Sequence, residues 1–259
     1  MTQVEAYLKY LRHERNYSRH TEISYYTDLC QFENFVTGIL GGFDTEQIDS
    51  DIVRRWVVEL MERKVSPRSI SRKLSGVKSF YGYLLEHHLV SHNPARGIKA
   101  PKASKPLPSF VNYAEMKPLL EEHTLAVDGQ GQFEAARDHA LVELLYLTGM
   151  RRDELIKLRD ADVDFSASQL LVNGKRSKQR LIPFSEKAAL MLKTYLEVRN
   201  KEVSLECDSL FVLKNGKPLY PMLVYRIVHR CLEGISTLSK MSPHVLRHSF
   251  ATGMLNNGA

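Results

Sequence analysis

Apolar residues recur at helical spacing through the first hundred residues of the chain. Val4, Tyr7, Leu8 and Leu11 follow the i, i+3, i+4, i+7 spacing of a single helical face. Three further helices are expected, with starts at Ser18, near Asp49 and at Ser66-Pro67, the last running to about His88. Their expected apolar faces are Ile23, Tyr26 and Cys30; Ile52, Trp56 and Leu60; and Ile70, Leu74, Val77, Tyr81 and Leu84. Four helices with short connections predict a small helical bundle.

Residues 92–109 have a different character. They contain four prolines and four basic residues and show no apolar periodicity. Such a composition predicts an extended, semi-stiff linker rather than a helix. The sequence therefore predicts an all-α domain over 1–100, a linker over 101–106 and a second domain over 107–259.

The second domain has a mixed pattern. Residues 134–147 resemble a buried helix that ends at Gly149. Two short apolar runs, 169–173 and 180–184, flank a charged turn and predict a β-hairpin. Further helices are expected at about 186–200 and 220–233, with a short strand at 210–212 between them. The predicted fold class is mainly α, with a small antiparallel sheet in an α+β second domain.

Composition narrows the class of protein. Hydrophobic residues make up 43% and charged residues 25%, which suits a globular chain and disfavours disorder throughout. The net charge of +6 permits a polyanionic partner. Three widely spaced cysteines without a C-x-x-C motif disfavour a disulfide framework, and reduced thiols favour a cytoplasmic location. Glu5 and Lys9 stand where a signal peptide would be apolar, and no uncharged apolar run approaches the ~18 residues of a membrane span.

A basic stretch suggests what the partner is. From Arg63 to Lys105 there are ten Lys or Arg residues and one acidic residue, Glu86. On the fourth helix, Arg68, Arg72, Ser75 and Ser79 are expected opposite the apolar face, where guanidinium and hydroxyl groups suit phosphates and base edges. Lys73 and Lys78 on this helix join them as candidate DNA contacts. The alternative is a merely solvated face, but the near absence of counter-charges favours DNA.

Histidines near the end of this helix also invite a metal site. His87, His88 and His92 have no acidic or cysteine partner nearby, so a solvated helix end is the preferred interpretation and no metal site is predicted.

Three short segments of the second domain carry candidate chemistry. His244 and Arg247 are three residues apart and share a helical face; Arg151 follows a glycine at the expected start of a helix, with Glu154 placed to orient it. Lys175 stands at the hairpin turn. Each feature alone is explained as readily by a structural role as by a catalytic one. Together, two arginines, a histidine and a lysine suit the stabilisation of a pentacovalent phosphorane and the protonation of a leaving oxygen.

These segments carry a resemblance to a known family. The blocks RDHALVELLYLTGMRRDELIKL, LLVNGKRSKQRLIPF, SLFVLKNGKPL and SPHVLRHSFATGMLNNGA, in this order, resemble the catalytic domain of tyrosine recombinases of the phage-integrase family, with a layout like that of Xer-type recombinases. SRHTEISYYTDLCQF and the segment from Ser66 to Lys102 resemble the family's SAM-like core-binding domain. The resemblance implies a DNA clamp that cuts and rejoins strands through a covalent 3′-phosphotyrosyl intermediate.

The resemblance assigns roles residue by residue. Arg151 and Arg247 would hold non-bridging phosphate oxygens, His244 would contact the same phosphate, and Lys175 would protonate the departing 5′ oxygen, with Lys178 as a rival. Lys178 and Arg180 are added as DNA contacts. No metal or other cofactor is implied, because the adduct keeps the bond energy. The implied partners are duplex DNA and a homo- or heterotetramer of recombinases on two sites. No membrane partner is implied.

One departure from the family pattern matters for activity. The family's nucleophilic tyrosine, a second active-site His or Trp and a docking helix lie downstream of H-x-x-R, whereas the last tyrosine here is Tyr225, upstream of His244. We therefore expect a recombinase truncated before its nucleophile, which binds DNA without cleaving it. The alternative is a non-catalytic DNA-binding regulator or decoy with the same clamp. The target sequence, and the choice between integration and chromosome-dimer resolution, stay open.

Overall fold

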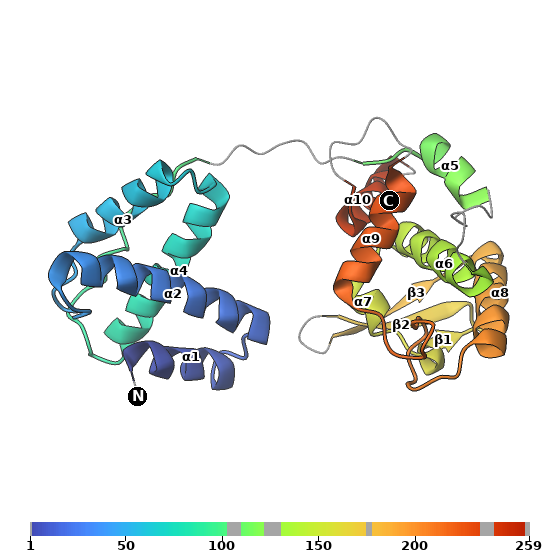
Figure 1. Cartoon of the computed structure of the whole chain (residues 1–259), viewed down its shortest axis with the longest axis horizontal. Coiled ribbons are helices and arrows are strands. Elements are labelled where there is room, and N and C mark those ends of the chain that lie inside the picture. Colours follow the sequence, from blue (N-terminus) through green and yellow to red (C-terminus); the bar gives the residue numbers. More distant parts are fainter. Residues whose placement is uncertain (1, 103–109, 122–130, 175–177, 234–240, 257–259) are drawn as a thin grey trace. The chain divides into compact units, whose positions relative to one another are not determined.

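The computed structural model describes residues 2–102, 110–121, 131–174, 178–233 and 241–256. The chain divides into two compact units, Met1–Pro106 and Leu107–Ala259, which are described separately (Figure 1). Within the described ranges, none of the helices combines the length and the apolar character needed to cross a bilayer.

The first unit is the predicted helical bundle. Its helices are α1 (Gln3–His13), α2 (Arg19–Leu40), α3 (Ser50–Glu62) and α4 (Pro67–Glu86). Side-chain oxygens of Ser18, Asp49 and Ser66 accept hydrogen bonds from backbone N–H groups in the first turns of α2, α3 and α4, and Pro67 occupies the first helical position of α4. The predicted starts are therefore confirmed, because short polar side chains satisfy the free N–H groups there.

The buried face of α2 differs from the prediction. Ile23 and Tyr26 are exposed, whereas Leu29, Phe32 and Val36 are fully buried. The sequence of α2 carries apolar residues at helical spacing on two faces, so spacing alone did not identify the face that packs. Phe32 lies edge-on to the ring of Trp56 from α3, with ring centroids 4.9 Å apart, and this contact belongs to the core of the bundle.

The stretch predicted as an extended linker begins later than expected. Val90, Ala95 and Ile98 are buried and join the core of the first unit. The Asn93 side chain caps this segment: its amide donates to the carbonyl of Lys78 at 3.0 Å, and its oxygen accepts from the N–H of Ala95 at 3.0 Å. Residues 92–98 therefore pack on the bundle, despite their proline and basic content. The segment 103–109 lies outside the described residues.

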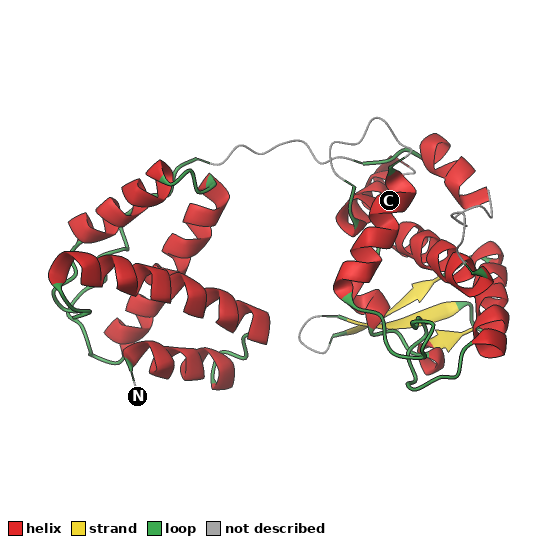
Figure 2. Cartoon of the chain, in the orientation of Figure 1, coloured by secondary structure: helices red, strands yellow, loops and turns green. Residues whose placement is uncertain are grey.

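The second unit combines helices with a small sheet (Figure 2). Its elements are α5 (Tyr113–Glu121), α6 (Gln132–Thr148), α7 (Arg152–Ile156), the 3-10 helix η1 (Asp160–Asp162), β1 (Val163–Asp164), β2 (Gln169–Asn173), β3 (Gln179–Pro183), α8 (Glu186–Glu202), α9 (Pro221–Leu232) and α10 (Pro243–Asn256). The strands pair antiparallel in the order β1-β2-β3, and Leu171 lies opposite Leu181 in the hairpin. The mainly helical class and the small antiparallel sheet are thus confirmed.

Helix α6 is the centre of this unit. It packs against α8 and α10, and Leu141, Leu144 and Leu145 are buried in the core. The strand predicted at 210–212 is wrong: Val212 forms only an isolated bridge with Pro218. These residues are buried beside α8, where the Tyr195 hydroxyl donates to the carbonyl of Leu210 at 3.0 Å. Side-chain burial accounts for their apolar character without a strand partner.

Candidate active site

The end of α6 sets the position of the first candidate arginine. Gly149 ends the helix in the left-handed region, with φ of 57°, and its N–H donates to the carbonyl of Leu145 at 3.0 Å. A β-carbon at this position would come within 2.3 Å of the Phe250 ring on α10, so the turn requires glycine. The chain then passes through the buried Met150 and places Arg151 directly before α7.

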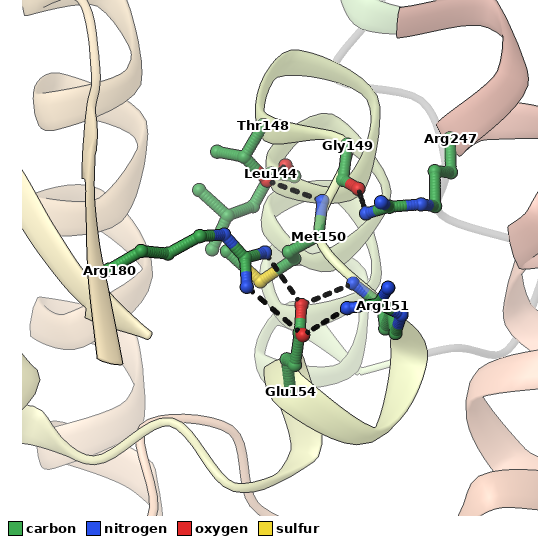
Figure 3. Close-up of polar contacts among 8 residues, drawn as sticks. All are labelled: Leu144, Thr148, Gly149, Met150, Arg151, Glu154, Arg180 and Arg247. Atoms are coloured by element: carbon green, nitrogen blue, oxygen red, sulfur yellow. Dashed lines mark hydrogen bonds and ion pairs between the residues drawn. The ribbon is translucent and has the colours of Figure 1, made fainter. Parts of the chain in front are cut away.

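Glu154 fixes the orientation of Arg151. Its carboxylate accepts from the backbone N–H of Arg151 at 2.8 Å and from the guanidinium of the same residue at 2.9 Å (Figure 3). The side chain of Arg151 remains 44% exposed, whereas that of Glu154 is 5% exposed. A buried carboxylate therefore holds a guanidinium that still reaches solvent, which confirms the expected orienting role of Glu154.

A second arginine comes from the hairpin. Both terminal nitrogens of Arg180 on β3 donate to the carboxylate of Glu154, at 3.1 and 2.8 Å. Burial raises the pKa of Glu154, but the hydrogen bonds from Arg180 and Arg151 outweigh burial and hold the pKa at about 2. The hydrogen bond to Glu154 in turn raises the pKa of Arg180. Glu154 therefore stays ionised far below neutral pH, and its carboxylate links α7 to β3.

The third arginine lies on α10. The guanidinium of Arg247 donates to the carbonyl of Gly149, at the turn that leads to Arg151 (Figure 3). Burial lowers the pKa of Arg247, and the nearby charge of Arg151 and then that of Arg180 lower it further. Helix α10 is tied to the unit because the Ser249 hydroxyl accepts from the N–H of Val111 at 2.7 Å.

A cavity of about 230 Å³ adjoins two of these arginines and is lined by Thr148, Gly149, Arg180, Arg247, Phe250 and Ala251. Three guanidinium groups gather here with one carboxylate, Glu154, so the cluster of Arg151, Glu154, Arg180 and Arg247 carries a net charge of +2. Three planar guanidinium groups with several N–H donors each, against one carboxylate, suit an anion with several oxygens, such as a phosphate diester. We call these four residues the arginine cluster.

Of the remaining catalytic candidates, the structure describes His244 and Lys178 but not Lys175. His244 is exposed in the first turn of α10, three residues before Arg247. Lys175 lies outside the described residues. Lys178 is exposed, and its carbonyl accepts from the N–H of Gly174 at 2.7 Å.

The basic helix of the first unit is only partly as expected. Arg68 is exposed on α4, and Arg72 is 48% exposed while it pairs with Asp28 of α2. Lys73 does not face solvent: its side chain is 9% exposed and its ammonium donates to Asp28 at 3.0 Å. The expectation of Lys73 as a surface contact is corrected, because the buried carboxylate draws it inward. Lys78 is half-buried and donates to the carbonyl of Ile98 at 2.7 Å.

Two contacts of the candidate residues were not predicted from the sequence. The pairing of Arg180 with Glu154 joins residues 26 apart, and the pairing of Lys73 with Asp28 joins residues 45 apart. Helical or strand spacing carries no signal for either. Within the described residues, no group of three or more His, Cys, Asp or Glu side chains forms a candidate metal site.

Comparison with models of known protein families shows which family the chain belongs to. The model of the phage integrase family matches residues 114–259, and the model of the phage integrase N-terminal SAM-like domain matches residues 4–88. The chain belongs to the phage integrase family. The resemblance inferred from the sequence blocks is therefore confirmed.

Relatives within the family are tyrosine recombinases. Tyrosine recombinase XerC of Chlorobaculum parvum is 39% identical over 278 aligned positions, which cover 99% of this chain and 83% of the relative. XerC of Bacillus subtilis is 36% identical over 262 positions, covering 99% and 84%. The XerH recombinase bound to its difH substrate shares the fold at 22% identity, with a TM-score of 0.74 and coverage of 98% and 74%. A lambda integrase dimer on a core site shares it at 19% identity, with a TM-score of 0.73 and coverage of 99% and 87%.

Proposed function

We propose that the chain has the DNA-binding and phosphate-holding groups of a site-specific DNA recombinase, an enzyme that cuts and rejoins strands through a covalent 3′-phosphotyrosyl intermediate. The observation that carries this proposal is the arginine cluster, with its net charge of +2 beside an open cavity. Its relatives are named tyrosine recombinases, and structures with its fold have been determined on DNA. These findings support a phosphodiester as the bound group.

In the proposed site, Arg151 and Arg247 hold the non-bridging oxygens of the scissile phosphate. Each guanidinium has five N–H donors, and the hydrogen bonds to Glu154 and to the carbonyl of Gly149 occupy only some of them. His244, one helical turn before Arg247, contacts the same phosphate. The charge that develops on these oxygens in the transition state is thereby stabilised by donors that are already oriented.

The proposed reaction needs a nucleophile and an acid. The deprotonated oxygen of a tyrosine attacks the phosphorus, the bond between phosphorus and the 5′ oxygen breaks, and Lys175 gives a proton to the departing 5′ oxygen, which leaves as a 5′-hydroxyl. A 5′-hydroxyl from a second strand then reverses these steps and releases the tyrosine. Lys175 has this role by its match to the family's hairpin lysine, and Lys178 is its rival.

The proposed partners are duplex DNA and a tetramer of like or related recombinases on two sites. In the first unit, Arg68 and Arg72 of α4 are exposed enough to contact DNA, and Lys78 retains two of its three N–H donors. Lys178 and Arg180 would add contacts from the hairpin of the second unit. Lys73 is left out of this set because its ammonium is buried.

The nucleophile determines what these 259 residues do by themselves. They contain no tyrosine after Tyr225, whereas the family's tyrosine follows the H-x-x-R pair. We propose that they bind duplex DNA without forming the phosphotyrosyl bond.

Two measurements on the 259-residue chain test the proposal. On a nicked duplex, a native gel should show binding and a denaturing gel should show no adduct. A surviving adduct would mean that Tyr220, Tyr225 or another residue attacks, and that the site is wrongly assigned.

In a salt titration, Arg151→Ala and Arg247→Ala should each reduce the slope of log affinity against log salt by about one, while Lys201→Ala, at an exposed lysine, serves as the control. Parental binding by both arginine variants at every salt concentration would refute a phosphate at the arginine cluster.

A further inference from the structure

A buried carboxylate lies beneath the basic helix of the first unit. Asp28 on α2 is 0% exposed, and it faces Arg72 and Lys73 of α4. One carboxylate oxygen accepts from the Arg72 guanidinium and the other accepts from the Lys73 ammonium at 3.0 Å. Lys73 also donates to the side-chain oxygen of Gln31, so its ammonium is held from two directions.

The two cations differ in exposure, and the difference separates their roles. Lys73 is 9% exposed and compensates the charge of Asp28 inside the bundle. Arg72 is 48% exposed, so most of its positive charge remains available to an external anion. Two cations against one anion leave a net charge of +1, which is presented to solvent by Arg72 alone.

We propose that Asp28 is a positioning residue, which holds the guanidinium of Arg72 in one orientation at the surface of α4 for contact with DNA. This inference rests on the proposed function, since it presupposes that α4 meets DNA. The hydrogen bond to Asp28 uses one terminal nitrogen of Arg72, so donors on the rest of the guanidinium remain for a phosphate or for the edge of a guanine. A long side chain that is ordered before binding loses less conformational freedom on binding.

The positive charge of Lys73 allows Asp28 to orient Arg72 without cancelling the charge of its guanidinium. Without Lys73, a buried carboxylate would offset the charge of Arg72 and weaken its attraction for DNA. With Lys73 in place, Asp28 supplies orientation without removing the net positive charge at the surface. The ion pair of Arg54 with Asp51 on α3, at 2.6 Å, has side chains that are 64% and 68% exposed, so it provides a solvated control for the buried carboxylate.

Double-mutant analysis of duplex binding by the 259-residue chain tests the proposal. The probe is one fluorescent duplex of fixed sequence, measured by anisotropy at one salt concentration. Simple electrostatics predicts that Asp28→Asn strengthens binding, because a negative charge is removed. We expect the opposite: a loss of affinity of about five-fold in the parent and no loss in the Arg72→Ala background. Asp51→Asn should change affinity by less than about two-fold.

Each other outcome has a definite meaning. Equal losses from Asp28→Asn in both backgrounds would indicate a purely structural role and overturn the proposal, as would unchanged or tighter binding in the parent. If Asp28→Asn fails to fold by circular dichroism, Arg72→Lys decides: it keeps the charge but lacks the planar fork, so we expect about five-fold weaker binding with an unchanged salt slope. Parental affinity of Arg72→Lys would overturn the proposal. Absence of duplex binding by the parent chain would instead refute the proposed function itself.

Discussion

Glu154 is the charge that holds the arginine cluster together, and its replacement by Gln is expected to destabilise the second unit. The pKa of Glu154 is about 2 in the folded protein against an ordinary value of 4.5. This difference, at about 1.36 kcal/mol for each pKa unit, corresponds to an upper limit of ~3.4 kcal/mol in favour of the charged form. Arg151 and Arg180 are 44% and 39% exposed, so solvent screening reduces the expected contribution to ~2 kcal/mol.

The pH dependence has a definite sign. Because the folded-state pKa is depressed, the stabilisation is fully present above the unfolded pKa near 4.5 and is lost as the pH falls toward the folded pKa of about 2. Glu154→Gln should therefore lower the free energy of unfolding by ~2 kcal/mol at pH 6, and by progressively less as the pH falls from 4.5 toward 2.5.

Urea unfolding of the whole chain provides the assay. Far-ultraviolet circular dichroism reports both units, whereas fluorescence of Trp56, the single tryptophan, reports the first unit and identifies its transition. Glu197→Gln, at an exposed carboxylate on α8, is the matched control and should leave both transitions in place. A difference between parent and Glu154→Gln that is the same at pH 6 and pH 3 would refute the reasoning, because the contact would then not depend on an ionised carboxylate.

Three further predictions concern single positions. Gly149→Ala should lower the thermal midpoint of the second unit, at a cost of roughly 2 kcal/mol or more from the left-handed backbone and the contact with Phe250, whereas Gly253→Ala, where a β-carbon meets nothing within 4 Å, should not lower it. Lys73→Ala should lower the unfolding midpoint detected by Trp56 fluorescence, because it leaves the buried Asp28 with one partner fewer. Arg68→Ala should leave that midpoint in place and weaken duplex binding, and the reverse pattern would contradict the placement of Lys73. In a form of the protein that carries a nucleophilic tyrosine, Lys175→Ala should slow cleavage by ~10²–10⁴-fold and recover when sulfur replaces the bridging 5′ oxygen; recovery of Lys178→Ala instead would identify Lys178 as the acid.

Local chemistry explains which parts of the fold were predictable. Ser18, Asp49 and Ser66 marked helix starts because a helix N-terminus needs an acceptor within three residues. The hairpin followed from alternation around a charged turn. The orientation of Arg151 by Glu154 was predictable for the same reason, since the two residues are three apart.

Contacts between distant segments explain the rest. The buried face of α2 depends on which of two apolar faces meets α3 and α4, and spacing within α2 does not contain that information. Lys73 looked like a surface cation until its position beside Asp28, 45 residues away, showed it to be buried. Arg180 was expected to contact DNA, and its link to Glu154 depends on how the hairpin packs against α7.

The central claim is that Arg151 and Arg247 hold the same phosphate of a DNA strand. Ethylation interference on the chain's preferred duplex measures this directly, because an ethylated phosphate has lost its charge and blocks binding wherever the protein needs it. We expect one phosphate whose ethylation weakens binding by the parent but has no effect on binding by Arg151→Gln. Ethylation of that same phosphate should also have no effect on binding by Arg247→Gln. Interference patterns that match the parent in both variants, or that lose two different phosphates, would contradict a shared phosphate at the arginine cluster.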